Sequence, residues 1–219
     1  MNTAAPLRID FVSDVVCPWC AIGLASLEQA LAKIEDEIAT QIHFQPFELN
    51  AQFGPEGEDV VEHLQKKYGL SAEQVADNQE NIRERGAALG FVFDWQRRQR
   101  TWNTFDAHRL LHWAALEGKQ LELKRALLKA NFTEGRNVSD VDTLVDVAVS
   151  VGLPEEAARA VLLEGQYSDE VRAAEQFFQR NGISSVPAII INQRHLISGG
   201  QPPEIFEKAL RDIAADKPA

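Results

Sequence analysis

The chain has 219 residues, of which 45% are hydrophobic and 25% charged, and its formal net charge is −11 at pH 7. This composition is ordinary for a globular protein and excludes a disordered or fibrous chain. The acidic balance argues against a nucleic-acid partner, because binding to phosphates needs clustered lysine and arginine. We interpret the longest basic cluster, Arg97 to Arg100, as a solvated turn rather than an anion site.

The length favours two domains, or one domain with a large insertion. No stretch approaches the ~20 apolar residues that cross a bilayer, and residues 1–14 lack the apolar core of a signal peptide. We therefore expect a cytoplasmic protein without a membrane partner, and its oligomeric state stays open.

The first fifty residues predict a strand, a helix and a second strand. Residues 7–13 alternate loosely and fit a strand. Spacings of 3, 4, 3 and 4 then predict one apolar helical face formed by Leu24, Leu27, Leu31, Ile34 and Ile38. Pro18 suits the first turn of this helix, while the acidic residues 35–37 oppose its dipole and predict an earlier end. Residues 42–49 predict the second strand, with Pro46 at an edge or bulge.

The middle of the chain is helical after a Gly/Pro-rich joint at residues 53–59. Ser71 and Gln74 resemble a capping box. Residues 91–101 look irregular, and the patterns predict helices over 60–68, 71–90, 104–117, 120–132, 139–151 and 154–163.

The last fifty residues predict a helix, two strands and a helix. The first helix covers residues 168–180, and the strands fall within 184–191 and 192–198. Pro202 and Pro203 begin the final helix. The turn at Asn192 and Gln193 lacks the glycine expected after asparagine, so its type is open.

The only two cysteines, Cys17 and Cys20, lie where the first strand gives way to the first helix. A sulfur at a helix start meets unpaired backbone N–H groups and the positive end of the helix dipole, which favour a thiolate. Cys20, one turn further on, is placed to resolve a mixed disulfide on Cys17. Two alternatives stay open: half of a zinc site completed by histidines or carboxylates, and two inert buried thiols.

A second signal is Pro187, which precedes an apolar strand run. Proline is tolerated at the first residue of a strand, and a tight turn there can hold a cis peptide bond. The segment alone favours an ordinary trans proline.

Four segments together resemble the DsbA family of the thioredoxin superfamily, and most of all its FrnE-like branch. They are CPWCAIG (17–23), WNTFDAHRL (102–110), GISSVPAIIIN (182–192) and ISGGQP (197–202). The resemblance implies an α/β, thioredoxin-like fold with a large all-helical insertion. The thioredoxin-like domain would comprise residues 1–52 and 167–219, and the insertion domain residues 53–166.

The resemblance also implies roles for the central residues. Cys17 would be the nucleophile, Cys20 the resolving thiol, and Pro187 a cis-proline beside the sulfurs. The backbone of Val186 would accept an extended substrate segment. The substrate would also meet Pro18 and Trp19, whose indole can grip an apolar group.

Weaker candidates surround this centre. The resemblance places Asn103 and His108 over the active-site cleft, although a helix cap and a helix-face histidine are equally good interpretations. Asp14 could relay a proton, cap the helix, or be a plain loop carboxylate. His108 and His112 are spaced for a metal, which we disfavour. Trp102 is either a substrate contact or core.

The predicted function is a thiol–disulfide oxidoreductase acting on disulfide-bearing proteins or small thiols and disulfides, with no bound cofactor and with glutathione as an optional co-substrate. Trp19 replaces the histidine of many oxidising members and carries no charge, so we expect a less oxidising couple. One alternative is a glutathione-dependent isomerase or transferase similar to 2-hydroxychromene-2-carboxylate isomerase, although those enzymes generally carry serine at position 17. The other is a binding or chaperone module with idle cysteines.

Overall fold

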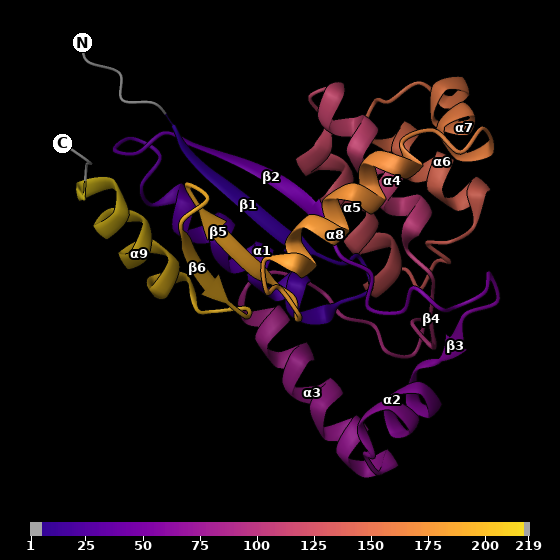
Figure 1. The fold of residues 1–219 in the computed structure, drawn as a ribbon. Coiled ribbons are helices and arrows are strands. Elements are labelled where there is room, and N and C mark those ends of the chain that lie inside the picture. Colours follow the sequence, from indigo (N-terminus) through magenta and orange to yellow (C-terminus); the bar gives the residue numbers. More distant parts are fainter. Residues whose placement is uncertain (1–5, 217–219) are drawn as a thin grey trace.

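A four-stranded mixed sheet brings the two ends of the chain together in the computed structural model, which describes residues 6–216 (Figure 1). The strands are β1 (Leu7–Ser13), β2 (Thr40–Pro46), β5 (Ala188–Ile191) and β6 (His195–Ser198), in the order β2-β1-β5-β6. β1 runs parallel to β2 and antiparallel to β5, and Val12 pairs with Ala188. This register places the segment that follows β1 and leads to Cys17 next to Pro187, which is the residue before β5.

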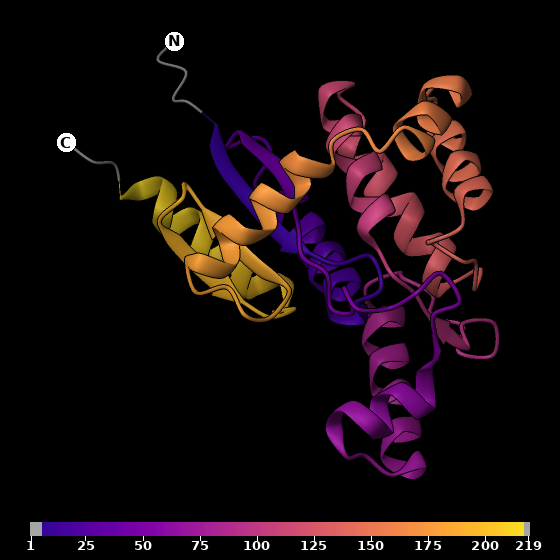
Figure 2. The ribbon, with the colours of Figure 1, turned by 45° about the vertical axis from the view of Figure 1, so that its right-hand side comes forward.

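Helices cover both faces of the sheet. α1 (Pro18–Ala32) and α9 (Pro203–Ala215) pack together on one face, and α8 (Ser168–Arg180) lies on the other (Figure 2). Burial from both sides explains why β1 is buried along nearly its whole length. The side chain of Phe11 in β1 is fully buried, together with those of Leu27 in α1 and Phe206 in α9.

The insertion is built from six helices, α2 (Val60–Tyr68), α3 (Ala72–Ala88), α4 (Phe105–Leu116), α5 (Gln120–Phe132), α6 (Val141–Ser150) and α7 (Glu155–Leu163). α4 to α7 enclose a separate apolar core, whereas α2 and α3 form a hairpin that extends away from them (Figures 1 and 2). α3 returns to pack against α1.

The predicted fold class is confirmed, with one correction to the insertion, which is not all-helical. β3 (Glu58–Asp59), in the predicted Gly/Pro-rich joint, pairs antiparallel with β4 (Arg100–Thr101), at the end of the stretch that we expected to be irregular. This short strand pair links the segment before α2 to the segment after α3, at the base of the α2–α3 hairpin. The division into residues 1–52 with 167–219 and residues 53–166 stays a prediction, and residues 1–5 and 217–219 of it lie outside the described residues.

Several local predictions are confirmed and others need adjustment. α1 ends at Ala32, before the acidic residues 35–37, as predicted. β2 begins two residues earlier than expected and ends at Pro46, on an edge strand. Ser71 and Gln74 form a full capping box. Asn192 and Gln193 both have positive φ, 51° and 56°, as a type I′ turn requires. No helix within residues 6–216 is long and apolar enough to cross a membrane.

Candidate active site at Cys17

Cys17 lies at the junction of β1 and α1. It is the N-cap of α1 with extended backbone angles, φ −90° and ψ 112°, and Pro18 fills the first helical position. The carbonyl of Cys17 accepts from the N–H groups of Cys20 at 3.1 Å and Ala21 at 3.3 Å, which begins the helical ladder. The Cys17 side chain makes no capping bond, so the sulfur is free for other contacts.

The Cys17 sulfur faces the residue before Pro187. Its S–H donates to the carbonyl of Val186 across 3.7 Å, and the peptide bond between Val186 and Pro187 is cis. Gly23, on the second turn of α1, lets the proline ring approach: a Cβ there would lie 3.2 Å from Cγ of Pro187. The sulfur and the proline therefore belong to one site.

The two cysteines have different surroundings. Cys17 is 4% exposed but lines a groove, whereas Cys20 is fully buried beneath it. Burial raises the pKa of the Cys20 thiol well above its ordinary value, and the hydrogen bond and charge of Cys17 add to the rise. Cys20 is thus a protonated thiol at neutral pH, underneath a sulfur that opens on the groove.

The groove has a volume of about 870 Å³ and runs from the start of α1 to the α2–α3 hairpin. Pro18, Trp19 and Val186, which we predicted to meet a substrate, line it beside Cys17. Much of its wall is apolar, and the further apolar residues include Phe47, Leu49, Val60, Leu64, Leu70, Val75, Ile82 and Trp95. Ser184 and Ser185, next to Val186, are both exposed and also line the groove.

Asn103 and His108 do not line this groove. Asn103 accepts from the N–H of Phe105 at 2.9 Å at the start of α4, and its amide donates to Glu48 at 3.3 Å. His108 is 3% exposed and lies against Asp14, with 3.6 Å between its Nε2 and a carboxylate oxygen. His108 therefore lies in the interior, and the half-buried Asn103 contacts the groove-lining Glu48; contact of either residue with a substrate stays a prediction.

Asp14 is a buried carboxylate, not a plain loop residue. It accepts from the backbone N–H of Leu49 at 2.8 Å and that of Val16 at 3.4 Å. Burial by itself would raise the pKa of Asp14, but the hydrogen bond and charge of His108, with the Leu49 N–H, lower it overall. An ionised carboxylate therefore lies behind the start of α1.

Sequence reasoning missed Arg98, and its interpretation as part of a solvated turn is wrong. Arg98 is 7% exposed, lines the groove, and stacks over the ring of Phe132 with 5.1 Å between guanidinium carbon and ring centre. Burial lowers the pKa of Arg98 to about 10, while the charges of Cys17 and Asp14 oppose that change. The aromatic run at residues 91–95 was the one signal that this segment folds inward.

A buried lysine behind the site was also missed. Lys124 on α5 is 1% exposed, and its charge interacts with those of Cys20, Asp14 and Cys17. The sequence did hold a signal: Lys124 shares a helical face with Leu121 and Leu128, at spacings of 3 and 4. Within residues 6–216, no three His, Cys, Asp or Glu side chains are grouped to hold a metal ion, including at His108 and His112.

Comparisons with known proteins extend over nearly the whole chain. Residues 8–211 match the family described as DSBA-like thioredoxin domain. The uncharacterized protein YwbO of Bacillus subtilis is 29% identical over 207 residues, which cover 94% of this chain and 96% of that protein. The crystal structure of the probable DsbA oxidoreductase SCO1869 from Streptomyces coelicolor has a TM-score of 0.91 and 35% identity, covering 97% of this chain and 92% of that one.

A more distant likeness shows the fold alone. The cytosolic disulfide reductase DsbM from Pseudomonas aeruginosa, solved with GSH, has a TM-score of 0.67 at 15% identity, covering 95% of this chain and 99% of that one.

Proposed function

Because the chain belongs to the DSBA-like thioredoxin domain family, we propose that it is a thiol–disulfide oxidoreductase in which Cys17 is the nucleophile and Cys20 the resolving thiol. The observation that carries this proposal is the pairing of a groove-lining sulfur with a second, fully buried sulfur one helical turn below it. Thiol–disulfide exchange needs that arrangement, because only one thiol meets the substrate and the other acts on the intermediate.

The exchange proceeds in two displacements. The Cys17 thiolate attacks one sulfur of a substrate disulfide, which forms a mixed disulfide and releases the other substrate sulfur as a thiolate. The Cys20 sulfur, once deprotonated, attacks the Cys17 sulfur. The intramolecular disulfide forms, the bond to the substrate breaks, and the substrate leaves as its second thiolate. The substrate gains two electrons and the protein loses them, and the reverse sequence oxidises a dithiol.

Arg98 supplies a positive charge that the Cys17–Cys20 segment itself lacks. Trp19 cannot stabilise a thiolate by charge, but the guanidinium of Arg98 is held beside the backbone of Val16 and interacts with the charge of Cys17. Arg98 therefore partly offsets the missing charge at Trp19. A less oxidising Cys17–Cys20 couple stays our prediction.

The groove suits a substrate larger than its reacting sulfurs. Apolar walls accept apolar side chains, while the accessible backbone at residues 184–186 can pair with an extended segment. We propose a disulfide-bearing protein segment as substrate, or a small thiol or disulfide such as glutathione as co-substrate. The structure of DsbM with GSH supports the second option by analogy of fold. A reducing, cytoplasmic setting is part of this proposal.

The alternatives explain less of the site. A glutathione-dependent isomerase needs one group to hold the thiol of glutathione, so it has no use for a resolving thiol under Cys17. A binding module with idle cysteines gives no reason for Cys17 to line the groove beside Val186 and Arg98.

A Cys20→Ser variant tests the proposal. With the resolving thiol removed, a disulfide substrate remains attached to Cys17, and mass spectrometry finds the adduct on that residue after non-reducing digestion. The matched Cys17→Ser variant forms no adduct. An adduct on Cys20 in the second variant, or none on Cys17 in the first, contradicts the assigned roles.

A further inference from the structure

Three cationic side chains along the groove have no acidic partner. Lys67 and Arg98 line the groove, and Arg85 lies over the ring of Trp19, which lines the groove beside Cys17. Within residues 6–216, none of the three forms an ion pair with an aspartate or a glutamate. The chain as a whole carries a formal charge of −11, so its composition does not lead us to expect unpaired cations at one groove.

The acidic side chain of the groove wall does not cancel these charges. Glu48 is the one acidic residue among the described residues that line the groove. One of its carboxylate oxygens is bound by Arg172, and the other accepts from the amide of Asn103 at 3.3 Å. Because Glu48 is already paired, the groove presents a positive balance to a substrate.

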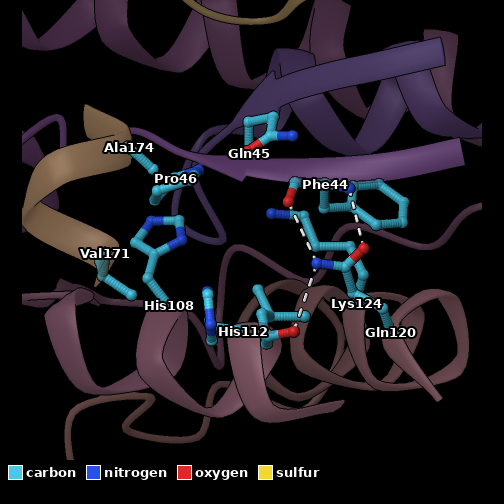
Figure 3. Close-up of a pocket in the computed structure, with 10 residues that line it drawn as sticks. Phe44, Gln45, Pro46, His108, His112, Gln120, Lys124, Val171 and Ala174 are labelled. Atoms are coloured by element: carbon cyan, nitrogen blue, oxygen red, sulfur yellow. Dashed lines mark hydrogen bonds between the residues drawn. The ribbon is translucent and has the colours of Figure 1, made fainter. Parts of the chain in front are cut away.

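A further unpaired cation, Lys124, lies outside the groove. It is 1% exposed and lines a separate cavity of about 40 Å³ between β2 and the helices α4, α5 and α8 (Figure 3). The residues that line this cavity are different from those that line the groove. A substrate beside Cys17 therefore does not meet the ammonium of Lys124.

Of the three cations at the groove, Arg85 is the one whose donors are available. The ammonium of Lys67 already donates to the carbonyl of Leu49 at 3.1 Å and to the side chain of Asn50 at 3.2 Å. Arg98 is buried and donates to the carbonyl of Val16. Arg85 is exposed, and its guanidinium carbon lies 5.2 Å from the ring centre of Trp19.

The position of Arg85 on α3 directs it to the reactive end of the groove. Asn78 and Ile82 line the groove, and Arg85 continues the same helical face at spacings of 4 and 3. Its contact with Trp19, two residues after Cys17, holds the guanidinium near the first turn of α1. The planar guanidinium fork matches a carboxylate, to which it can donate two parallel hydrogen bonds.

We propose that Arg85 is a specificity-determining residue that binds a carboxylate close to the reacting sulfur of the substrate, so that the protein prefers carboxylate-bearing disulfides. This inference rests on the proposed function and names its substrate class. Arg85 takes no part in the two displacements, since it binds a group that the reaction leaves unchanged. The carboxylate belongs either to an acidic segment of a protein or to a small thiol acid.

Two aromatic disulfides measure this preference. Dithiobis(nitrobenzoate) carries a carboxylate on each ring, dithiodipyridine is neutral near pH 7, and both release a coloured product when a thiolate attacks. In a Cys20→Ser background each probe reports the attack by Cys17 alone. We expect Arg85→Gln to lower the rate constant for the anionic probe by about threefold to fivefold relative to that for the neutral probe.

The ratio of the two rate constants isolates substrate binding. Both reactions depend on the same Cys17 thiolate, so a change in its ionisation cancels in the ratio. Arg83→Gln is the matched control, because Arg83 is an exposed arginine of the same helix that is paired with Glu80, and it keeps the wild-type ratio. Arg85→Lys retains the charge but not the fork and recovers part of the preference.

Two further pairs of substrates distinguish the sources of the carboxylate. One pair is a peptide disulfide with glutamate or glutamine beside the cysteine, and the other is dithiodiglycolate or its neutral amide. A preference that depends on Arg85 in either pair supports the inference and identifies the source.

Three results would overturn the inference: an unchanged ratio in Arg85→Gln, the same loss in Arg83→Gln, or an equal loss for the anionic and neutral probes. If neither probe reacts with Cys17 when Arg85 is intact, the proposed function fails instead.

Discussion

The guanidinium of Arg98 donates a hydrogen bond to the carbonyl of Val16 at 3.3 Å, from 82 residues further along the chain. This bond fixes a cation from the insertion next to the residue that precedes Cys17. The insertion thus supplies part of the electrostatics of the active site as well as a wall of the groove.

Removing that cation should slow the reactions of Cys17. In a Cys20→Ser background, we expect Arg98→Met to reduce the rate of iodoacetamide alkylation near pH 6 by about tenfold, because an opposite charge favours the thiolate. Arg98→Lys should recover part of the rate. The exposed neighbour Arg97 gives the control variant Arg97→Met, and an equal effect there would exclude a specific role for Arg98.

The two thiols should also differ in reactivity. In the reduced native protein, we expect iodoacetamide to label Cys17 near pH 7 and to leave Cys20 unmodified until the protein is unfolded. Burial raises the pKa of Cys20, so raising the pH to about 9 should add little labelling at that site. Peptide mapping measures each site separately, and comparable rates at the two sulfurs would contradict the arrangement described above.

The local parts of the site could be predicted from the sequence because neighbours along the chain determine them. Pro18 is suited to the first helical turn, which sets Cys17 at the N-cap and Cys20 one turn below. The capping box at Ser71 and Gln74 is equally local. Such features can be predicted from the spacing of a few residues. The thioredoxin-like fold was predicted from the resemblance of the four sequence motifs to a known family.

The surroundings of the sulfurs could not be predicted in the same way, because they depend on contacts between distant elements. Asp14 and His108 look like ordinary polar residues until β1 and α4 are packed together. Arg98 looks solvated because its sequence neighbours are charged, yet the fold turns it inward over Phe132. Lys124 is the exception, since its helical face was visible in the spacing of leucines.

Asp14 should stabilise the protein through its ionised form. Hydrogen bonds to a charged group contribute about 1.5–3 kcal/mol, so Asp14→Asn should lower the free energy of unfolding by about that amount at neutral pH. Because the folded-state pKa of Asp14 is lowered, its contribution is present above the unfolded value of about 4 and is lost as pH falls through the folded value.

Urea unfolding of the two proteins at several pH values checks this sign. The difference between wild type and Asp14→Asn should be constant from about pH 8 to pH 5 and should narrow below about pH 4. Asp77→Asn, at an exposed position on α3, is the control and should change stability by less than about 0.5 kcal/mol. A gap that widens in acid would contradict the account.

The motif ISGGQP contains a glycine that packs against the first turn of α1. A Cβ at Gly200 would lie 2.9 Å from the carbonyl oxygen of Trp19, between the two cysteines. Gly200→Ala should therefore displace the first turn of α1 and lower the free energy of unfolding by about 1–3 kcal/mol. Thermal unfolding measures the loss, with the exposed Ser198→Ala as control. An unchanged melting temperature would show that the loop yields instead.

Lys124 should oppose stability. Replacing buried charged groups by apolar side chains of similar volume stabilises proteins by up to about 1–4 kcal/mol, so Lys124→Met should raise the free energy of unfolding at pH 7. The folded-state pKa of Lys124 is lowered, so the wild type carries the full penalty below that folded value and loses it as pH rises towards the unfolded value of about 10.4. The stability advantage of Lys124→Met should shrink over the same pH range, as measured by urea unfolding at neutral and alkaline pH.

Lys129→Met is the control and should show no such trend. A destabilised Lys124→Met would mean that the amine has a stabilising partner in the folded protein.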